Sequence, residues 1–138
     1  MNAATSIQPP ELLLPSFDPA HIVTIDFETY YDKDYKLRKM TTAGYVRDPR
    51  FEVICVGVKV DDGEAMLFEE AEFREWARTW NWSTSAVIAH NAMFEALICS
   101  HHYGIIPGFW FDTLSMSRAL NLDGNLKFLM QHFGVGEK

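Results

Sequence analysis

Hydrophobic and polar positions in this chain first follow the spacing of strands. Residues 21–27 (HIVTIDF) are apolar and β-branched, which predicts a strand buried on both faces. Two further strands are predicted at 51–60 (FEVICVGVKV) and 64–68 (EAMLF). The Asp-Asp-Gly sequence at 61–63 between them is a hairpin signal, so these two strands should be antiparallel.

Helical spacing follows the hairpin. Within residues 70–80, Phe73, Trp76, Ala77 and Trp80 recur at the i, i+3, i+4 and i+7 positions of one helix face. Large apolar side chains that share one face predict that this face packs on the core of the domain.

Strands and helices alternate in the rest of the chain. Such alternation predicts an α/β fold in which a mixed β-sheet is flanked by helices. Residues 1–20 are punctuated by proline, and we interpret them as a lead-in to a domain at 21–138. The remaining predicted elements are a strand at 86–90, a helix at about 92–102, a strand around 109–112, a helix at about 114–121 and a helix from Leu126.

The composition is that of one globular domain. The chain has 138 residues, of which 48% are hydrophobic and 14% aromatic, so it is neither disordered nor long enough for two domains. It contains no run of about 18 apolar residues and no basic residue near its N-terminus, so neither a membrane span nor a signal peptide is expected. Cys55 and Cys99 lie in apolar stretches, which indicates buried free thiols in a reducing compartment such as the cytoplasm.

The net charge of −7 argues against a protein that coats nucleic acid through general positive charge. The charge is uneven, however, because six of the twelve basic residues lie within 33–50, close to Tyr30, Tyr31 and Tyr35. Aromatic rings beside positive charge suit base stacking and the binding of a phosphate backbone. An exposed amphipathic loop or helix would carry the same pattern, and both interpretations stay open. The six basic residues are Lys33, Lys36, Arg38, Lys39, Arg47 and Arg50.

Two acids end the first predicted strand. Asp26 and Glu28 are two residues apart, so both side chains project from one face while Phe27 points into the opposite layer. Neighbouring carboxylates repel each other unless a cation lies between them. The carboxyl ends of strands are also where α/β sheets usually place their sites. A strand that has reached solvent and carries two solvated acids would show the same triplet.

A second polar segment follows the predicted strand at 86–90. Asn91 is suited to cap the next helix. Glu95 lies in the first turn of that helix, where a carboxylate interacts favourably with the helix dipole. Taken alone, this segment is accounted for by helix capping.

Together the two polar segments resemble a known family. Residues 25–29 (IDFET) resemble the first motif of the DEDD family of 3′→5′ exonucleases, and residues 89–95 (AHNAMFE) resemble the second. Residues 111–113, 118–120 and 126–134 are similar to the exonuclease domain of bacteriophage family-A DNA polymerases. The resemblance implies a ribonuclease-H-like fold and a proofreading-type activity that hydrolyses the 3′-terminal phosphodiester of DNA, in a bacterial or phage-infected cell.

The resemblance also implies two divalent metal ions, Mg²⁺ or Mn²⁺, which suit the hard oxygen ligands of carboxylates. It implies that Asp26 bridges the two ions, that Glu28 holds the ion that activates water, and that Glu95 serves the other ion. Glutamate is one methylene longer than the aspartate that many members have at the position of Glu95. Two metals of this kind can activate a water and stabilise the departing 3′ oxygen.

The same resemblance assigns the neighbours of these acids to the substrate. Thr29, Asn91 and Phe94 are expected to seat the terminal nucleotide of a single-stranded DNA 3′ end or to shape its site. Phe27 and Asp112 are weaker candidates. Asp112 ends a predicted strand and precedes a predicted helix, so its favoured interpretation is a helix N-cap.

One departure from the family concerns its third motif, a Tyr or His followed four residues later by Asp, which does not occur after Glu95 in this sequence. We therefore expect a C-terminally incomplete domain that supplies three of four carboxylates and has weak or no activity alone. The expected partner is a second polypeptide with the missing motif or a polymerase domain, and an uncovered apolar layer favours self-association. Two alternatives stay open: a catalytically silent module that binds DNA or a replication partner, and an interaction protein that no longer binds nucleic acid.

Overall fold

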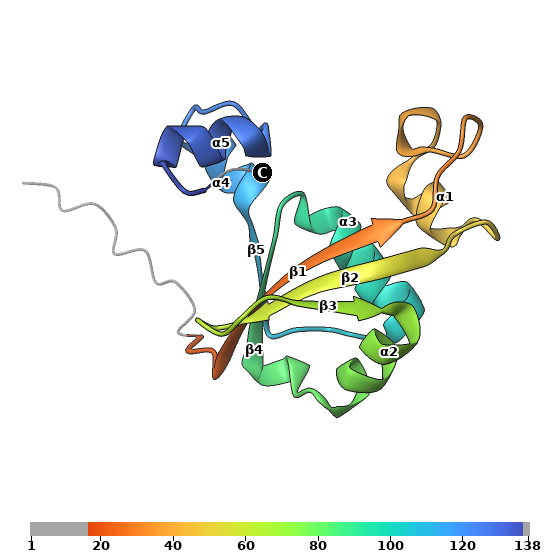
Figure 1. Ribbon diagram of the computed structural model, residues 1–138, viewed down its shortest axis with the longest axis horizontal. Coiled ribbons are helices and arrows are strands. Elements are labelled where there is room, and N and C mark those ends of the chain that lie inside the picture. The colour runs from red at the N-terminus through yellow and green to blue at the C-terminus, as the bar shows by residue number, and fades with distance from the viewer. Residues whose placement is uncertain (1–16, 137–138) are drawn as a thin grey trace, which may run out of the picture.

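The structure, a computed structural model, describes residues 17–136 and places their strands in one sheet of order β3-β2-β1-β4-β5 (Figure 1). β1 pairs antiparallel with β2 and parallel with β4, so the sheet is mixed, and the predicted α/β class is confirmed. Most of the predicted lead-in, residues 1–16, lies outside the described residues. The strands are β1 (His21–Thr29), β2 (Val53–Val60), β3 (Met66–Glu69), β4 (Ser85–Ala89) and β5 (Phe109–Asp112).

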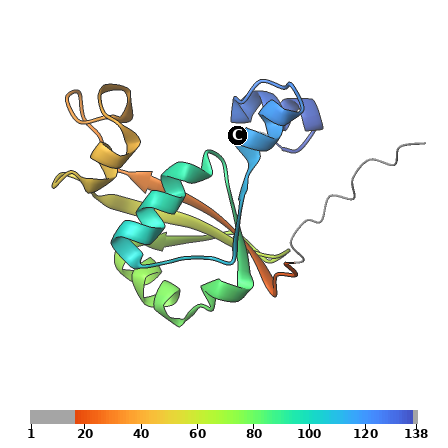
Figure 2. The same cartoon turned by 180° about the vertical axis from the view of Figure 1, so that it is seen from behind.

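Helices α2 and α3 cover one face of the sheet, and Figure 2 shows α3 crossing in front of the strands when the molecule is seen from behind. Among residues 17–136, no helix is long and apolar enough to cross a membrane. The helices are α1 (Thr42–Arg47), α2 (Glu70–Thr79), α3 (Ala92–Ile98), α4 (Thr113–Ala119) and α5 (Leu126–Phe133), with short 3₁₀ helices η1 (Leu37–Lys39) and η2 (Trp82–Thr84) and a π-helical turn η3 (Cys99–Tyr103).

β1 has one buried face rather than two. Val23, Ile25 and Phe27 are buried, whereas Thr24 and Asp26 between them are exposed. The prediction of a strand buried on both faces is therefore wrong. The reason is that α2 and α3 pack on the side of Phe27, whose ring contacts Phe73 of α2 at a centroid distance of 5.3 Å.

The other face of the sheet, which we call the open face, carries Thr24, Asp26 and Glu28. Apolar side chains also reach it, because Phe111 pairs with Ile88 and Ile88 pairs with Thr24 in register. Phe111 is 38% exposed. An uncovered apolar layer is thus present in the described part of the chain, and self-association through it stays a prediction.

The predicted hairpin and its following helix are confirmed. β2 and β3 pair antiparallel, and the turn between them closes with a 3.0 Å hydrogen bond from the Gly63 N–H to the Val60 carbonyl. In α2, Phe73 and Ala77 are buried, and Trp76 is half-buried and packed against the core, as is Trp80 directly after the helix. The apolar stripe therefore faces the core as its spacing predicted.

The predicted helix at about 92–102 is observed in two parts. Its α-helical part ends at Ile98 and continues through the π-helical turn η3, which Gly104 terminates with φ 64°. Cys99 at the junction is buried, whereas Cys55 on β2 is half-buried, and both are free thiols. The expectation of buried thiols is met by Cys99 and only in part by Cys55.

Residues 30–50 form a projecting segment between β1 and β2, which we call the lobe (Figure 1). It contains η1 and α1, which are both too short to show a helical repeat of apolar residues in the sequence. The lobe carries the six basic residues noted above and lies where β1 ends.

Candidate functional site

The carboxyl ends of β1, β4 and β5 meet at one edge of the sheet, where α/β folds usually place their sites. Thr24 pairs with Ile88, and Ala89, the last residue of β4, pairs with Asp112 at the end of β5. β1 continues beyond this level, so Asp26 and Glu28 lie at the edge where α3 begins.

Asp26 and Glu28 are both exposed on the open face, while Phe27 between them is buried in the core, as the sequence predicted. Gly57 of β2 lies opposite Asp26 and has no side chain that could cover the carboxylate. The pairing with β2 becomes irregular between Glu28 and Thr29. Bulges of this kind bend a strand and re-aim its side chains, and they are common beside functional sites.

Glu95 is the buried member of the set, with only 4% of its surface exposed. Its Oε2 atom has no hydrogen-bond partner among the described residues. The pKa of the Glu95 carboxyl is raised to about 8, mainly by burial and in part by the charges of Asp26 and Asp112, while the N–H groups of Glu95 and Phe27 act to lower it. A carboxylate in this position is stabilised by any cation that reaches it.

Two hollows flank the acids. A separate hollow of ≈ 350 Å³ lies away from the acids, between the start of β2, α2 and η3, and contains none of the predicted site residues. The Glu28 hollow (≈ 440 Å³) is lined by Phe27, Glu28, Thr29, Tyr31, Lys36, Leu37, Arg38, Tyr45 and Phe94. The Asp26 hollow (≈ 460 Å³) is lined by Thr24, Ile25, Asp26, Ile88, Ala89, His90, Thr113 and Leu126.

Thr29 and Phe94, two of the residues predicted to seat a nucleotide, meet in the Glu28 hollow through Tyr45. The Tyr45 hydroxyl donates to the Tyr30 carbonyl (2.6 Å), so the Thr29 hydroxyl donates to Tyr45 (2.9 Å). The Phe94 ring lies 6.0 Å from the Tyr45 ring. Sequence reasoning missed Tyr45, because its place beside the first motif arises only when α1 folds back on β1.

Asn91 does not cap α3 through its side chain, and this prediction is wrong. Its backbone is left-handed (φ 71°, ψ 56°), a conformation that asparagine tolerates better than most residues. The Asn91 N–H instead donates to the carboxylate of Asp112 on β5 (2.9 Å). Asn91 lines neither of the two hollows, so a direct role in seating a nucleotide stays an untested prediction.

Asp112 has the capping role that its position predicted. Its carboxylate accepts from the Leu114 N–H (3.0 Å) at the start of α4 and from the Ser115 hydroxyl (2.8 Å). Partial burial acts to raise the pKa of Asp112, but these hydrogen bonds and those from the N–H groups of Ala92 and Asn91 hold the pKa below its usual value. Asp112 thus ties the starts of α3 and α4 to β5.

His90, which follows β4, is a second residue that sequence reasoning passed over. Its Nε2 lies 2.8 Å from the Gly124 carbonyl and therefore carries a proton, while Nδ1 lies 2.8 Å from the Thr113 hydroxyl. The ring thus holds the α4–α5 connection against the sheet edge, beside Asp26. Its position inside the segment that resembles the second motif was the available signal.

The donor set suits a hard divalent cation, since it consists of three carboxylates. Among residues 17–136, no group of three or more His, Cys, Asp or Glu side chains is gathered closely enough to hold a metal ion. Two of the acids are exposed, however, and the third has an unpartnered buried oxygen. The chemistry of the residues therefore fits a metal, provided that Asp26 and Glu28 turn toward Glu95.

No family model and no curated protein matches the sequence. The fold resembles solved nucleases. Brucella melitensis NrnC bound to pGG is similar with a TM-score of 0.60 at 20% identity, over 85% of this chain and 54% of NrnC. The same protein with bound Mg²⁺ gives 0.60 at 19% identity over 85% and 55% of the two chains. A structure described as the apo form of the nuclease gives 0.61 at 19% identity over 88% and 55%.

This chain therefore spans about half the length of the solved structures that it resembles. At such identity the likeness shows a shared fold. The mixed sheet flanked by helices is consistent with the ribonuclease-H-like fold that the family resemblance implied.

Proposed function

We propose that this chain is a metal-dependent 3′→5′ exonuclease segment that hydrolyses the terminal phosphodiester of a single-stranded DNA 3′ end. The observation that carries the proposal is Glu95, a buried carboxyl with an unpartnered oxygen whose pKa is raised in part by Asp26. Such a group is unfavourable in a purely structural position. It becomes favourable when a cation is shared with neighbouring acids.

Some residues at the sheet edge would bind the metal ions, and others would bind the substrate. Asp26 and Glu28 offer charged oxygens from β1, and Glu95 offers its free oxygen from α3. Two divalent ions, when bound, would activate a water and stabilise the departing 3′ oxygen. Thr29 and Phe94 line the Glu28 hollow, where an aromatic ring can stack on the terminal base.

The solved relatives support a nucleic-acid substrate and Mg²⁺ as the metal. NrnC has been solved with pGG and with Mg²⁺, and this chain shares its fold. The use of two ions, the preference for DNA and the proofreading setting beside a polymerase rest on the sequence resemblance alone. A second polypeptide with a further carboxylate, or a polymerase domain, is the proposed partner.

The direct test is release of nucleotides from single-stranded DNA that is labelled at its 5′ end, with Mn²⁺, with Mg²⁺ or with a chelator. A ladder that shortens stepwise from the 3′ end, only in the presence of metal, is the expected result. Cleavage at internal positions, or no cleavage at any metal concentration even when a polypeptide that carries the missing third motif is added, would contradict the proposal.

A catalytically silent nucleic-acid-binding module is the second candidate. It is favoured by the observation that, among the described residues, no three potential metal ligands lie close enough together to hold a metal ion. Binding of the same labelled strand without any shortening in Mn²⁺ would select this candidate. Failure of both binding and cleavage would leave only the interaction protein.

A further inference from the structure

The lobe is positively charged on an otherwise acidic protein. Residues 30–50 contain six Lys or Arg and three Asp, a net charge of +3, whereas the whole chain has a net charge of −7. A local excess of this kind attracts polyanions even when the overall charge is negative.

Two of the three lobe acids are used inside the lobe. Asp32 accepts from the N–H groups of Asp34 and Tyr35, each at 2.7 Å, and from the Tyr30 hydroxyl at 3.0 Å. Asp48 accepts from two nitrogens of the Arg50 guanidinium at 2.8 and 2.9 Å.

The third lobe acid, Asp34, faces Lys39 at 3.4 Å across an exposed and therefore weak ion pair. Ion pairs among the described residues thus involve Lys39 and Arg50 but leave Lys33, Lys36, Arg38 and Arg47 without an acidic partner. These four side chains are available to an external anion.

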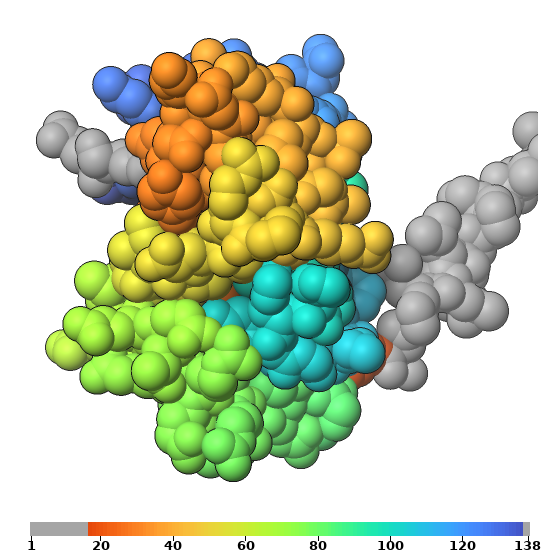
Figure 3. All heavy atoms as spheres, turned by 90° about the vertical axis from the view of Figure 1, so that its right-hand side faces the viewer, coloured from red at the N-terminus to blue at the C-terminus, as the bar shows by residue number. Residues whose placement is uncertain are grey.

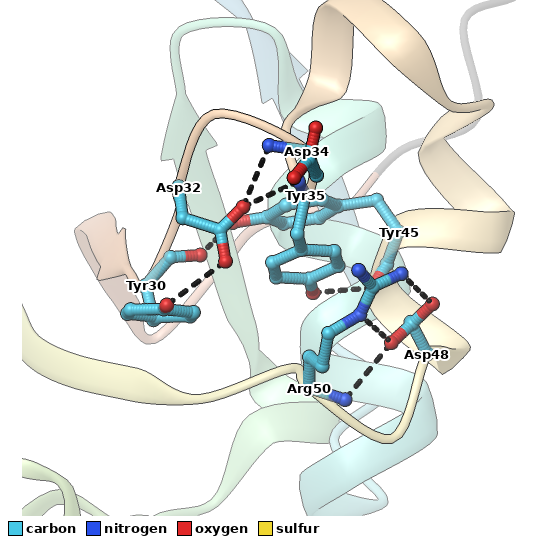
Figure 4. A network of polar contacts seen from close by, with 7 residues as sticks. All are labelled: Tyr30, Asp32, Asp34, Tyr35, Tyr45, Asp48 and Arg50. Atoms are coloured by element: carbon cyan, nitrogen blue, oxygen red, sulfur yellow. Dashed lines mark hydrogen bonds and ion pairs between the residues drawn. The ribbon is translucent and has the colours of Figure 1, made fainter.

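The lobe is held in one shape by a column of stacked groups (Figure 4). The buried Tyr35 ring stacks on Tyr45 with centroids 4.4 Å apart, its hydroxyl donates to the Tyr45 carbonyl (2.8 Å), and the Arg50 guanidinium lies 4.7 Å above it. His102 of η3 donates to the Val46 carbonyl (2.7 Å) and so fastens α1 to the body of the domain. A positive surface built on fixed elements binds without a large ordering penalty.

The lobe is continuous with the candidate site. Lys36 and Arg38 line the Glu28 hollow together with Phe94, and Tyr31 at the same hollow is 73% exposed. In Figure 3 the lobe forms the upper part of the face, above the residues of α3 and η3. Positive charge and an exposed aromatic ring therefore extend outward from the acids.

We propose that the lobe binds the phosphate backbone of a single strand upstream of the nucleotide at the Glu28 hollow, so that affinity rises with strand length. This inference depends on the proposed function in one respect only, the position of the 3′ end. Single-stranded nucleic acid is the occupant that fits, because it pairs phosphates with the free Lys and Arg side chains and an unpaired base with Tyr31.

The test is binding of fluorescent oligothymidylates, a dinucleotide and an octanucleotide, measured in chelator so that no cleavage occurs. The wild type should bind the octanucleotide clearly more tightly. Lys36→Gln/Arg38→Gln should weaken octanucleotide binding by about tenfold and lower its salt slope by about 1.4, which is about 0.7 for each lost phosphate contact. Binding of the dinucleotide, which offers fewer phosphates, should weaken less.

The matched control is Lys59→Gln/Arg78→Gln, which removes the same charge from β2 and α2 at exposed positions outside both hollows. It should keep the wild-type salt slope. Equal affinity of the wild type for both lengths, or an equal loss in the control, would overturn the inference. If binding depends on length as expected but no strand is shortened in Mn²⁺, the lobe inference stands and the proposed nuclease activity fails.

Discussion

Replacing Asp26 by asparagine is expected to reduce Mn²⁺-dependent release of nucleotides from a single-stranded DNA 3′ end by about 100-fold or more. Asparagine keeps the size of the side chain and one oxygen but loses the negative charge that would be shared between cations. Because Asp26 is exposed at the end of β1, the fold should tolerate the change. The measurement is the initial rate of shortening of the labelled strand, with thermal unfolding recorded on the same samples.

The control for this prediction is Asp62→Asn in the hairpin turn after β2, an exposed acid outside both hollows. It removes the same charge and should leave the rate unchanged. A rate for Asp26→Asn within a fewfold of the wild type, with the fold intact, would show that the carboxylate has no part in hydrolysis.

Glu95 gives the second large effect, on stability rather than on activity. Burial raises the pKa of Glu95 in the folded chain to about 8, from 4.5 when it is solvated. The folded state therefore binds more protons than the unfolded state between these values, and stability must fall as pH rises through this range. In chelator, protonation of Glu95 should contribute fully to the free energy of unfolding below about pH 5. This contribution should be lost as the pH rises through about 8.

Glu95→Gln removes the charge and keeps the shape. At about 1.4 kcal/mol per pKa unit, and with relaxation around the ionised group taken into account, the variant should be about 2 to 4 kcal/mol more stable than the wild type at high pH. The difference should shrink as the pH is lowered toward the solvated pKa. Urea unfolding in chelator at a series of pH values measures it.

The control is Glu64→Gln, an exposed change between β2 and β3. Because Glu95 is intact in this variant, its stability should fall with rising pH as that of the wild type does. If Glu95→Gln follows the same curve as the wild type at every pH, then Glu95 is not buried as a proton-binding carboxyl. The free oxygen that supports the metal proposal would then have no energetic consequence.

The sequence predicted best those elements whose apolar pattern repeats over several turns or whose turn residues are specific to one structure. The stripe of α2 spans several turns, and the Asp-Asp-Gly turn at 61–63 admits few other structures, so both were found. The exposed face of β1 was not predicted, because an apolar run does not reveal how many layers will pack on it. That depends on where helices distant in the chain come to lie.

The burial of Glu95 was also missed, although the sequence carries a signal for it. Ala92, Glu95 and Ile98 are three residues apart and share the buried face of α3. Their spacing could have placed Glu95 on that buried face as well as in the first turn of the helix. Asn91 was misassigned for a different reason, since its left-handed backbone and its contact with Asp112 depend on the pairing of β4 with β5.

If Asp26, Glu28 and Glu95 act together on a divalent cation, calorimetric titration of the chain with Mn²⁺ should detect that cation directly. We expect saturable binding of Mn²⁺ to the wild type that weakens at least about tenfold in Asp26→Asn and in Glu95→Gln, but not in Asp62→Asn. Absence of saturable binding to the wild type, or equal binding to all four proteins, would contradict it.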